Sequence, residues 1–416
     1  MSTSTSLPSG KSYAWNIEPI GYTDLIGKPA FKMALHQAGD RWYLYTATFW
    51  HPGWHIVDVT DPTKPRHIRF IDGPENTWTL QIQIADGKMI TSHERIADGW
   101  GHDPSKPFGE GMQVWSLEDP ENPKILGEFK TGGEGTHRNY YDGGRYVYVT
   151  GLPEGYDGHI LQIVDIADPA NPVEVSRWWR EGQHVAGGEA GVSHGTLLHG
   201  GAYVKGDRAY LPYSAGGFVI LDIADKTKPT MVSDLPFSPP FLSFIGVHTA
   251  LPQQDRDIVI VNSEAIREMC QEPLGHCAVV DISDESDPHM IALMPLPEPP
   301  PDAPYRNFCE KGGRFGPHNQ HQPQYQPHLY QNDDLVFLTY FNAGLRIYDV
   351  SDPRLPKEVA WFLPPDPTER RGLLPASKLV AQTEDVVVDR RGNIFISDKN
   401  HGIYVLRWDG LPPSKN

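Results

Sequence analysis

The stretch LQIVDIADPANPVEV, residues 161–175, decides the fold of this chain. Ile163, Val164 and Ile166 predict a strand rich in β-branched residues. Asp168-Pro169 then predicts a tight turn, because Asp can bond its own backbone and Pro fixes φ at the next position. A second strand begins at Val173. The segment is therefore one strand-turn-strand unit.

The same unit recurs along the chain at intervals of 49 to 68 residues. Its other copies are HIVDVTDPTKP (55–65), MQVWSLEDPENP (112–123), FVILDIADKTKP (218–229), CAVVDISDESDP (277–288), LRIYDVSDPRLP (345–356) and a degraded GIYVLRWDG (402–410). An interval of this length holds four short strands with their loops, and the 40 Gly and 39 Pro fit a turn-dense protein. We expect the turn aspartates (Asp61, Asp119, Asp168, Asp284, Asp352) to cap backbone and to have no catalytic role.

The repeat predicts an all-β fold, a seven-bladed β-propeller of four-stranded antiparallel blades. A hairpin signal precedes each copy, as in GDRWYLYTATF and GGRYVYVTG. The last unit, 380–410, supplies only three strands, so we expect the N-terminal strand within 13–24 to complete it and close the ring. Residues 1–12 are expected to be a disordered tail, and residues 13–416 a single propeller domain.

These repeats resemble the LVIVD-repeat family of propellers, over nearly the whole chain. The most specific stretches are HGGAYVKGDRAYL (199–211), GGRFGPHNQHQ (312–322), LVFLTYFNAGLRIYDVSDP (335–353) and QTEDVVVDRRG (382–392). The resemblance implies the propeller fold and little about chemistry. After Gln320 the sequence departs into HQPQYQPHLY, a loop particular to this chain.

Charge and composition limit the partners. A net charge of −17 argues against nucleic acid and anionic membrane surfaces. No apolar run reaches the ~20 residues of a membrane span, and the N-terminus has no apolar signal segment. Three cysteines predict no disulfide framework; Cys270 and Cys277 are either buried thiols or a redox or metal pair. We expect a cytoplasmic protein with a small-molecule substrate, and the sequence leaves the oligomeric state open.

Four histidines stand at matched places, before or at the start of the innermost strand of consecutive blades. They are His137, His199, His248 and His318. Equivalent positions in different blades converge on one axis, so we predict that these side chains surround a metal ion. His194 is an alternative to His199, and His321 or His328 an alternative to His318. Each could instead be a hydrogen-bonded channel residue.

Fe(II) is the favoured cofactor, with Zn, Mn or Cu as alternatives. This ligand set is similar to that of the carotenoid-oxygenase class, another propeller with histidines from different blades; the likeness is one of fold. Glu134, Glu189, Glu264 and Glu384 are expected to accept a hydrogen bond from the other ring nitrogen of the ligating histidines. Glu384 or Asp385, at the seventh blade, would orient a ligand or carry a proton.

The leading functional hypothesis is an Fe(II) oxygenase acting on a small, partly aromatic molecule at the propeller mouth. The same histidines could serve a metal-dependent hydrolase or lyase, and the fold is also used as a non-catalytic interaction scaffold. Some aromatics could wall a substrate pocket or pack between sheets, the second being the usual arrangement in propellers: Trp50, Trp54, Tyr213, Phe241, Phe244, Phe308, Phe315, Tyr340.

Overall fold

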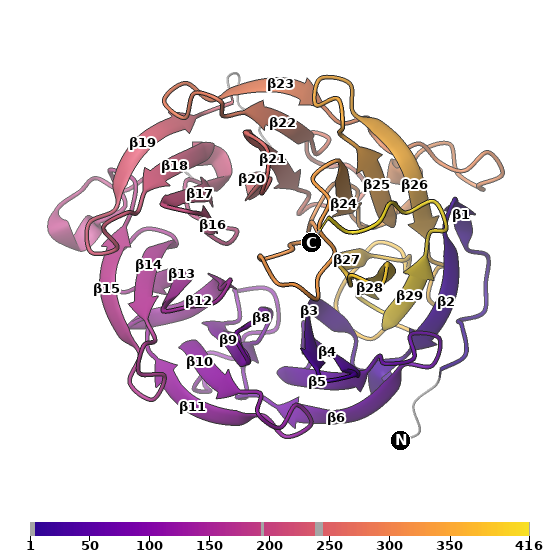
Figure 1. The fold of residues 1–416 in the computed structure, drawn as a ribbon, viewed down its shortest axis with the longest axis horizontal. Helices are drawn as coiled ribbons and strands as arrows, with labels where there is room; N and C mark the ends of the chain where they lie inside the picture. Colours follow the sequence, from indigo (N-terminus) through magenta and orange to yellow (C-terminus); the bar gives the residue numbers. More distant parts are fainter. Residues whose placement is uncertain (1–4, 193–194, 238–243, 416) are drawn as a thin grey trace.

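The computed structural model describes residues 5–192, 195–237 and 244–415. Its strands form antiparallel sheets that stand in a ring around a central axis (Figure 1). The only α-helix in these ranges is the single turn α1 (Phe308–Lys311), beside 3₁₀ turns at Leu25–Gly27, Val185–Gly187 and Ser214–Gly216. No helix in the described ranges is long and apolar enough to cross a membrane.

Each repeat folds as a meander whose strands pair in chain order. The first consists of β3 (Ala30–Ala38), β4 (Arg41–Thr48), β5 (Gly53–Asp58) and β6 (Arg66–Asp72). A nine-stranded sheet joins two meanders, β8 to β11 and β12 to β15, through one pair, Gly135 with Glu94. Its strands are β7 (Thr77–Trp78), β8 (Ile82–Ala85), β9 (Lys88–Arg95), β10 (Gly111–Ser116), β11 (Lys124–Phe129), β12 (Gly133–Tyr140), β13 (Tyr146–Pro153), β14 (Ile160–Asp165) and β15 (Val173–Trp178).

The remaining sheets continue around the ring. Two are β16 (Tyr203–Lys205), β17 (Arg208–Pro212), β18 (Phe218–Asp222), β19 (Thr230–Leu235), and β20 (Ile245–Pro252), β21 (Ile258–Glu264), β22 (Cys277–Asp281), β23 (His289–Leu293). The last two contain β24 (Leu335–Thr339), β25 (Leu345–Asp349), β26 (Lys357–Leu363), and β27 (Thr383–Val388), β28 (Asn393–Asp398), β29 (Ile403–Arg407).

The N-terminal segment supplies the outer strand of both last sheets. β1 (Tyr13–Trp15) pairs with β26, and β2 (Glu18–Thr23) pairs with β29. The predicted N-terminal strand therefore pairs with the last strand of the chain. Of the predicted tail, residues 1–4 lie outside the described ranges, while Lys11 forms an ion pair with Asp302.

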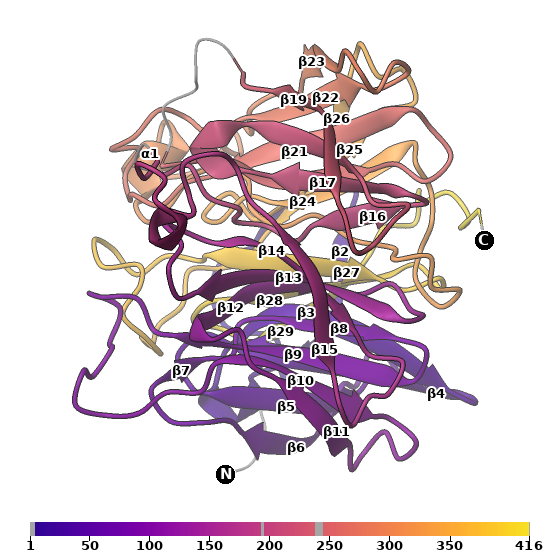
Figure 2. The same cartoon turned by 90° about the vertical axis from the view of Figure 1, so that its left-hand side faces the viewer.

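Apolar side chains from neighbouring sheets fill the space between them. One core joins Ile347 and Phe362 to Val386 and Ile396, and the other sheet pairs are packed in the same way. The strands nearest the axis are buried, whereas the rim strands β6, β11 and β15 are partly exposed (Figure 1). Figure 2 shows β7 and α1 towards one face and the C-terminus towards the other.

The turn aspartates cap backbone as predicted. Oδ1 of Asp168 accepts from the N–H of Ala170 at 3.1 Å, and Oδ1 of Asp61 accepts from Thr63 at 3.0 Å. The same bond occurs at Asp119, Asp284 and Asp352. In each copy the Asp carbonyl also accepts from the residue three positions on, which closes the β-turn.

The prediction for Cys270 was wrong, whereas the buried thiol predicted for Cys277 is confirmed. Cys270 and Cys309 form a disulfide, and Cys277 is a buried free thiol. The loop after β21 brings Cys270 to α1, although the two cysteines are 39 residues apart. Proximity in sequence had suggested the Cys270–Cys277 pair, but Cys277 lies on β22 with its side chain in the core between sheets.

Candidate metal centre

The four predicted histidines lie side by side near the axis. The ring centroids of His137 and His199 are 4.6 Å apart, those of His199 and His248 5.2 Å, and those of His248 and His318 4.8 Å. Imidazoles bound to one ion through bonds of about 2.1 Å would have neighbouring centroids roughly 4.5–5 Å apart. Neighbouring rings in the row therefore have the spacing of adjacent metal ligands. Among the described residues, the groups whose ligand atoms all lie within 4.8 Å of one another are two trios, Glu94–His137–His159 and His199–His248–Glu264.

Backbone irregularities bring these side chains to the axis. The pairing of β12 with β13 shifts between Thr136 and Arg138, so His137 is the extra residue of a bulge. Shifts also span His248 on β20 and Glu384 on β27. A bulge bends the strand and re-aims the side chain. At three inner strands the local break in pairing therefore coincides with a site residue.

Glycines beside the histidines allow close backbone approach. A Cβ on Gly135 would lie 2.3 Å from the carbonyl oxygen of His93, and one on Gly200 would lie 2.0 Å from that of His248. Gly135 also has φ +109°, a conformation that side chains disfavour. A residue with a side chain at Gly135 or Gly200 would therefore clash with the neighbouring backbone.

Three of the histidines donate from Nδ1 to a fixed acceptor. His137 Nδ1 lies 2.7 Å from Oε2 of Glu94, and His318 Nδ1 lies 2.7 Å from the carbonyl oxygen of Glu384. His248 Nδ1 contacts Oγ1 of Thr249 at 2.8 Å. Carboxylate and carbonyl oxygens only accept, so Nδ1 of His137 and of His318 carries the proton and Nε2 keeps its lone pair. In His248 the Arg138 guanidinium, which only donates, contacts Nε2 and so places the proton on Nδ1.

The Nε2 atoms converge on Glu264, at the end of β21. Its carboxylate oxygens lie 3.2 Å from Nε2 of His199, 3.4 Å from that of His248 and 3.7 Å from that of His318. His248 and His318 present lone pairs to an acceptor-only carboxylate, so no hydrogen bond can form between them. A cation bound between the two Nε2 atoms and the Glu264 carboxylate would interact favourably with each of these groups. His199, His248 and Glu264 also qualify by distance as a metal-binding trio.

Glu94 forms a second, adjacent trio with His137 and His159. His159 Nε2 lies 2.6 Å from Oε1 of Glu94, and the His159 ring is 5.4 Å from that of His137. Glu94 and His159 were missed from the sequence. The available signal was position: Glu94 on β9 and Glu264 on β21 both stand near the end of the second strand of their meander.

Buried cations, also missed from the sequence, surround the row. Arg138 Nη2 donates to Nε2 of His248 at 2.6 Å, so a metal ion and this guanidinium compete for one lone pair. Arg314 Nη1 lies 3.3 Å from Glu264 Oε1, and Lys399 Nζ lies 2.7 Å from Glu384 Oε1.

The two predicted catalytic carboxylates have different surroundings. Glu384 Oε2 lies 3.3 Å from Nδ1 of His318, which places it at the row. Asp385 instead accepts from Lys32 Nζ and from the N–H of Met33, both at 2.8 Å. Of the four glutamates predicted to accept from the histidines, Glu264 and Glu384 contact them. The other two bind elsewhere: Glu134 pairs with Arg95, and Glu189 accepts from backbone N–H groups of Gly182 and His184.

The alternative histidines bind backbone or cannot be placed. His321 contacts the carbonyl oxygen of Tyr330 and the N–H of Val388, and His328 contacts the carbonyl oxygen of Leu35. His194 lies outside the described residues. His318, rather than His321 or His328, is therefore a member of the row, and His199 belongs to it through its ring distances to His137 and His248.

Burial sets the protonation of the site. It lowers the pKa of His248 and His318 well below the ordinary value, and that of His199 to about 4. Burial also raises the pKa of Glu384. These three histidines are neutral near pH 7, the form that binds metal.

The predicted aromatics divide between core and site. Most are buried among sheets: Trp54, Tyr213, Phe308, Phe315 and Tyr340. Trp50 contacts Phe49 near the histidines, Phe244 is exposed, and Phe241 lies outside the described residues.

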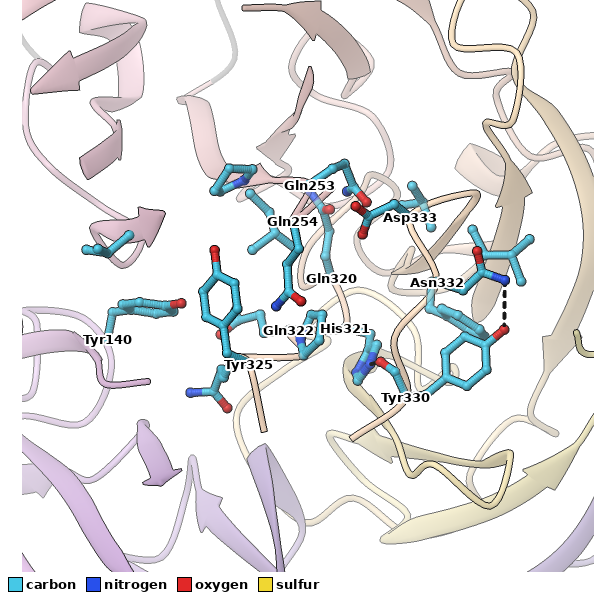
Figure 3. A pocket seen from close by; sticks show the side chains of 18 residues that line it. Tyr140, Gln253, Gln254, Gln320, His321, Gln322, Tyr325, Tyr330, Asn332 and Asp333 are labelled. Carbon is cyan, nitrogen blue, oxygen red and sulfur yellow. Dashed lines mark hydrogen bonds between the residues drawn. The ribbon is translucent and has the colours of Figure 1, made fainter. Parts of the chain in front are cut away.

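A small polar cavity of about 30 Å³ lies beside the loop 320–333 (Figure 3). Tyr140, Gln253, Gln322 and Tyr325 are among its lining. Gln324 donates to the carbonyl oxygen of Tyr141 at 2.9 Å, so this loop is tied to a sheet far away in sequence. The volume suits roughly one water molecule. The side-chain amide of Gln324 links the loop to the segment that follows β12.

Solved structures share the fold at low sequence identity. The β-propeller domain of Cps50 (Swd1) from Myceliophteria thermophila matches with TM-score 0.54 and 12% identity, over 92% of this chain and 97% of that one. A protein from Lactobacillus plantarum matches with TM-score 0.52 and 11% identity, over 91% and 97%. No curated protein matches this chain in sequence. The LVIVD repeat pattern matches residues 143–178 and 202–235, so this chain carries LVIVD repeats, in agreement with an LVIVD-repeat propeller family.

Proposed function

We propose that the protein is a metal-dependent enzyme and that His137, His199, His248 and His318 hold the ion through Nε2. The observation that carries the proposal is that Nε2 of His318, and Nε2 of His248 with Arg138 as its present donor, face the Glu264 carboxylate without a proton to share with it. Fe(II) is the favoured ion, since imidazole is a good ligand for it, and Zn, Mn and Cu remain alternatives. Bound there, Fe(II) would supply dioxygen chemistry to an oxygenase.

The ring itself is proposed to be a seven-bladed propeller in one domain, 13–416, closed by the N-terminal strand. The pairing of β2 with β29 supports closure. The repeat copies support seven blades, as does the division of the nine-stranded sheet into two meanders joined by one residue pair.

The surrounding residues would orient the ligands. Glu94, Thr249 and the Glu384 carbonyl hold Nδ1–H groups and so fix the ring orientations. Arg138 must release His248 when an ion binds. The Glu384 carboxylate, beside Lys399, would carry a proton for the reaction, whereas Asp385 would hold Lys32.

The histidine row is reachable from one side. The side chains of His137 and His199 are 13% and 14% exposed, while those of His248 and His318 are buried. Metal and a small, partly aromatic substrate would therefore approach past His137 and His199.

A metal-dependent hydrolase or lyase is the second candidate. The observation favouring it is Glu264, a carboxylate at the centre of the ligand set that could take a proton from metal-bound water. Turnover that requires dioxygen would separate the oxygenase from this alternative. A non-catalytic scaffold would bind no metal.

The disulfide Cys270–Cys309 is typical of proteins from oxidising compartments and does not favour the cytoplasmic expectation.

Elemental analysis of protein purified without chelators tests the metal proposal. We expect stoichiometric metal in the wild type, its loss in His248→Asn and His318→Gln, and its retention in the control His289→Gln, whose side chain is exposed and contacts the carbonyl oxygen of Asp287. A metal-free protein that gains neither stability nor activity from Fe, Mn, Zn or Cu would overturn the proposal.

A further inference from the structure

An aromatic cluster lies directly beside the histidine row. It consists of Phe31, Phe49, Trp50, Trp78 and Trp100. The Phe49 ring is 5.7 Å from both Trp78 and Trp100, and the Phe31 ring is 5.7 Å from that of His318. Phe49 and Trp100 retain partial exposure, so the cluster has an accessible side.

Two buried cations face this aromatic cluster. The Arg314 guanidinium carbon lies 5.2 Å from the Trp100 ring centroid and 5.4 Å from that of Phe341. Lys399 Nζ lies 4.3 Å from the Phe49 centroid. The cluster thus offers ring faces and positive charge together, close to Glu264 and Glu384.

Arg314 has more hydrogen-bond donors than the protein satisfies. Its side chain is 4% exposed, and its Nη1 donates to Oε1 of Glu264 at 3.3 Å. Within the described part of the chain, Nε and Nη2 of Arg314 are buried and have no partner. A buried donor without an acceptor is costly, and a guanidinium edge fits the two oxygens of a carboxylate.

We propose that the aromatic cluster and Arg314 together bind an aromatic carboxylate. The ligand's ring would lie against Trp100 and Phe49, and its carboxylate would accept from Nε and Nη2 of Arg314. Lys399 would add positive charge next to the ring. That this ligand is the substrate rests on the proposed metal-dependent function; the binding itself rests on the aromatic cluster and Arg314.

Calorimetric titration with benzoate tests the inference, with benzamide as the uncharged probe and cyclohexanecarboxylate as the non-aromatic one. Wild-type protein, both as purified and chelator-treated, should bind benzoate saturably and bind the other two more weakly. Arg314→Gln and Arg314→Lys should each weaken benzoate binding about 10- to 100-fold, as expected for a lost charged hydrogen bond. The control Arg306→Gln removes an arginine whose side chain is 89% exposed and should bind as the wild type does.

The outcomes separate the two proposals. Benzoate binding by a protein that is metal-free as purified, and that gains neither stability nor activity from Fe, Mn, Zn or Cu, would refute the metal proposal and leave this one standing. Metal-loaded protein that binds benzoate no better than benzamide would overturn the carboxylate inference alone. Unchanged affinity in folded Arg314→Lys, with circular dichroism like the wild type, would do the same. Trp100→Ala should weaken benzoate more than it weakens cyclohexanecarboxylate, and equal losses would remove the aromatic part of the inference.

Discussion

Single hydrogen bonds determine which nitrogen of each histidine faces the row. His137 donates Nδ1–H to Glu94, which also contacts His159, so one carboxylate orients two rings. Glu94→Gln replaces an acceptor oxygen with a donor and should lower metal affinity about 10- to 100-fold, as is typical when a ligating histidine loses its hydrogen-bond acceptor. Competition against a chelator of known affinity would measure the change.

The matched control at this scale is Glu134→Gln. Glu134 is half-exposed and pairs with Arg95 rather than with a histidine. It should keep wild-type metal affinity. Equal affinities for Glu94→Gln and the wild type would show that Glu94 does not orient a ligand.

At the scale of the element, the aspartate turns recur as one device from sheet to sheet. Asp168 accepts from Ala170 N–H and from the Asn171 side chain, and hydrogen bonds to these groups lower its pKa. Asp168→Ala should lower the melting temperature, since the turn loses its cap, while Asp168→Asn should lower it less because an amide oxygen still accepts. Metal content and turnover per folded molecule should stay at the wild-type level in both variants; a loss of turnover without destabilisation would contradict a purely structural turn.

The disulfide is the second element-scale feature. It closes a segment of 39 residues between the loop after β21 and α1. Cys309→Ser should lower the free energy of unfolding by about 2–4 kcal/mol, because the unfolded chain regains loop entropy. Denaturant titration measures this loss. Thiol counting in denaturant should find one free thiol before reduction and three after it; three before reduction would refute the bridge.

At the scale of the whole molecule, buried neutral histidines make stability depend on pH. Burial lowers the pKa of His36, His93 and His321 to about 4. In the unfolded chain the pKa of histidine is about 6.5. Between these values the unfolded chain binds more protons, so the free energy of unfolding should be greatest above about pH 6.5 and fall as the pH drops towards 4.

Urea titrations at a series of pH values would measure this dependence. The variant His36→Gln should show a shallower fall in the free energy of unfolding than the wild type, because it lacks one of the titrating groups. Stability that is constant between pH 6.5 and pH 4 would contradict neutral burial of these histidines.

The all-β fold, the capping role of the turn aspartates and the four histidines that lie side by side could all be predicted from the sequence. These follow from local rules: alternation and β-branching specify strands, Asp and Pro specify turns, and equal positions in successive repeats converge on one axis. Only the tertiary structure decided which groups surround the row. Glu94, Arg138, Arg314 and Lys399 reach it from bulges, strand ends and loops whose positions depend on the packing of several sheets. The Cys270–Cys309 bridge likewise depends on a loop and α1 meeting in space, which no local sequence rule specifies.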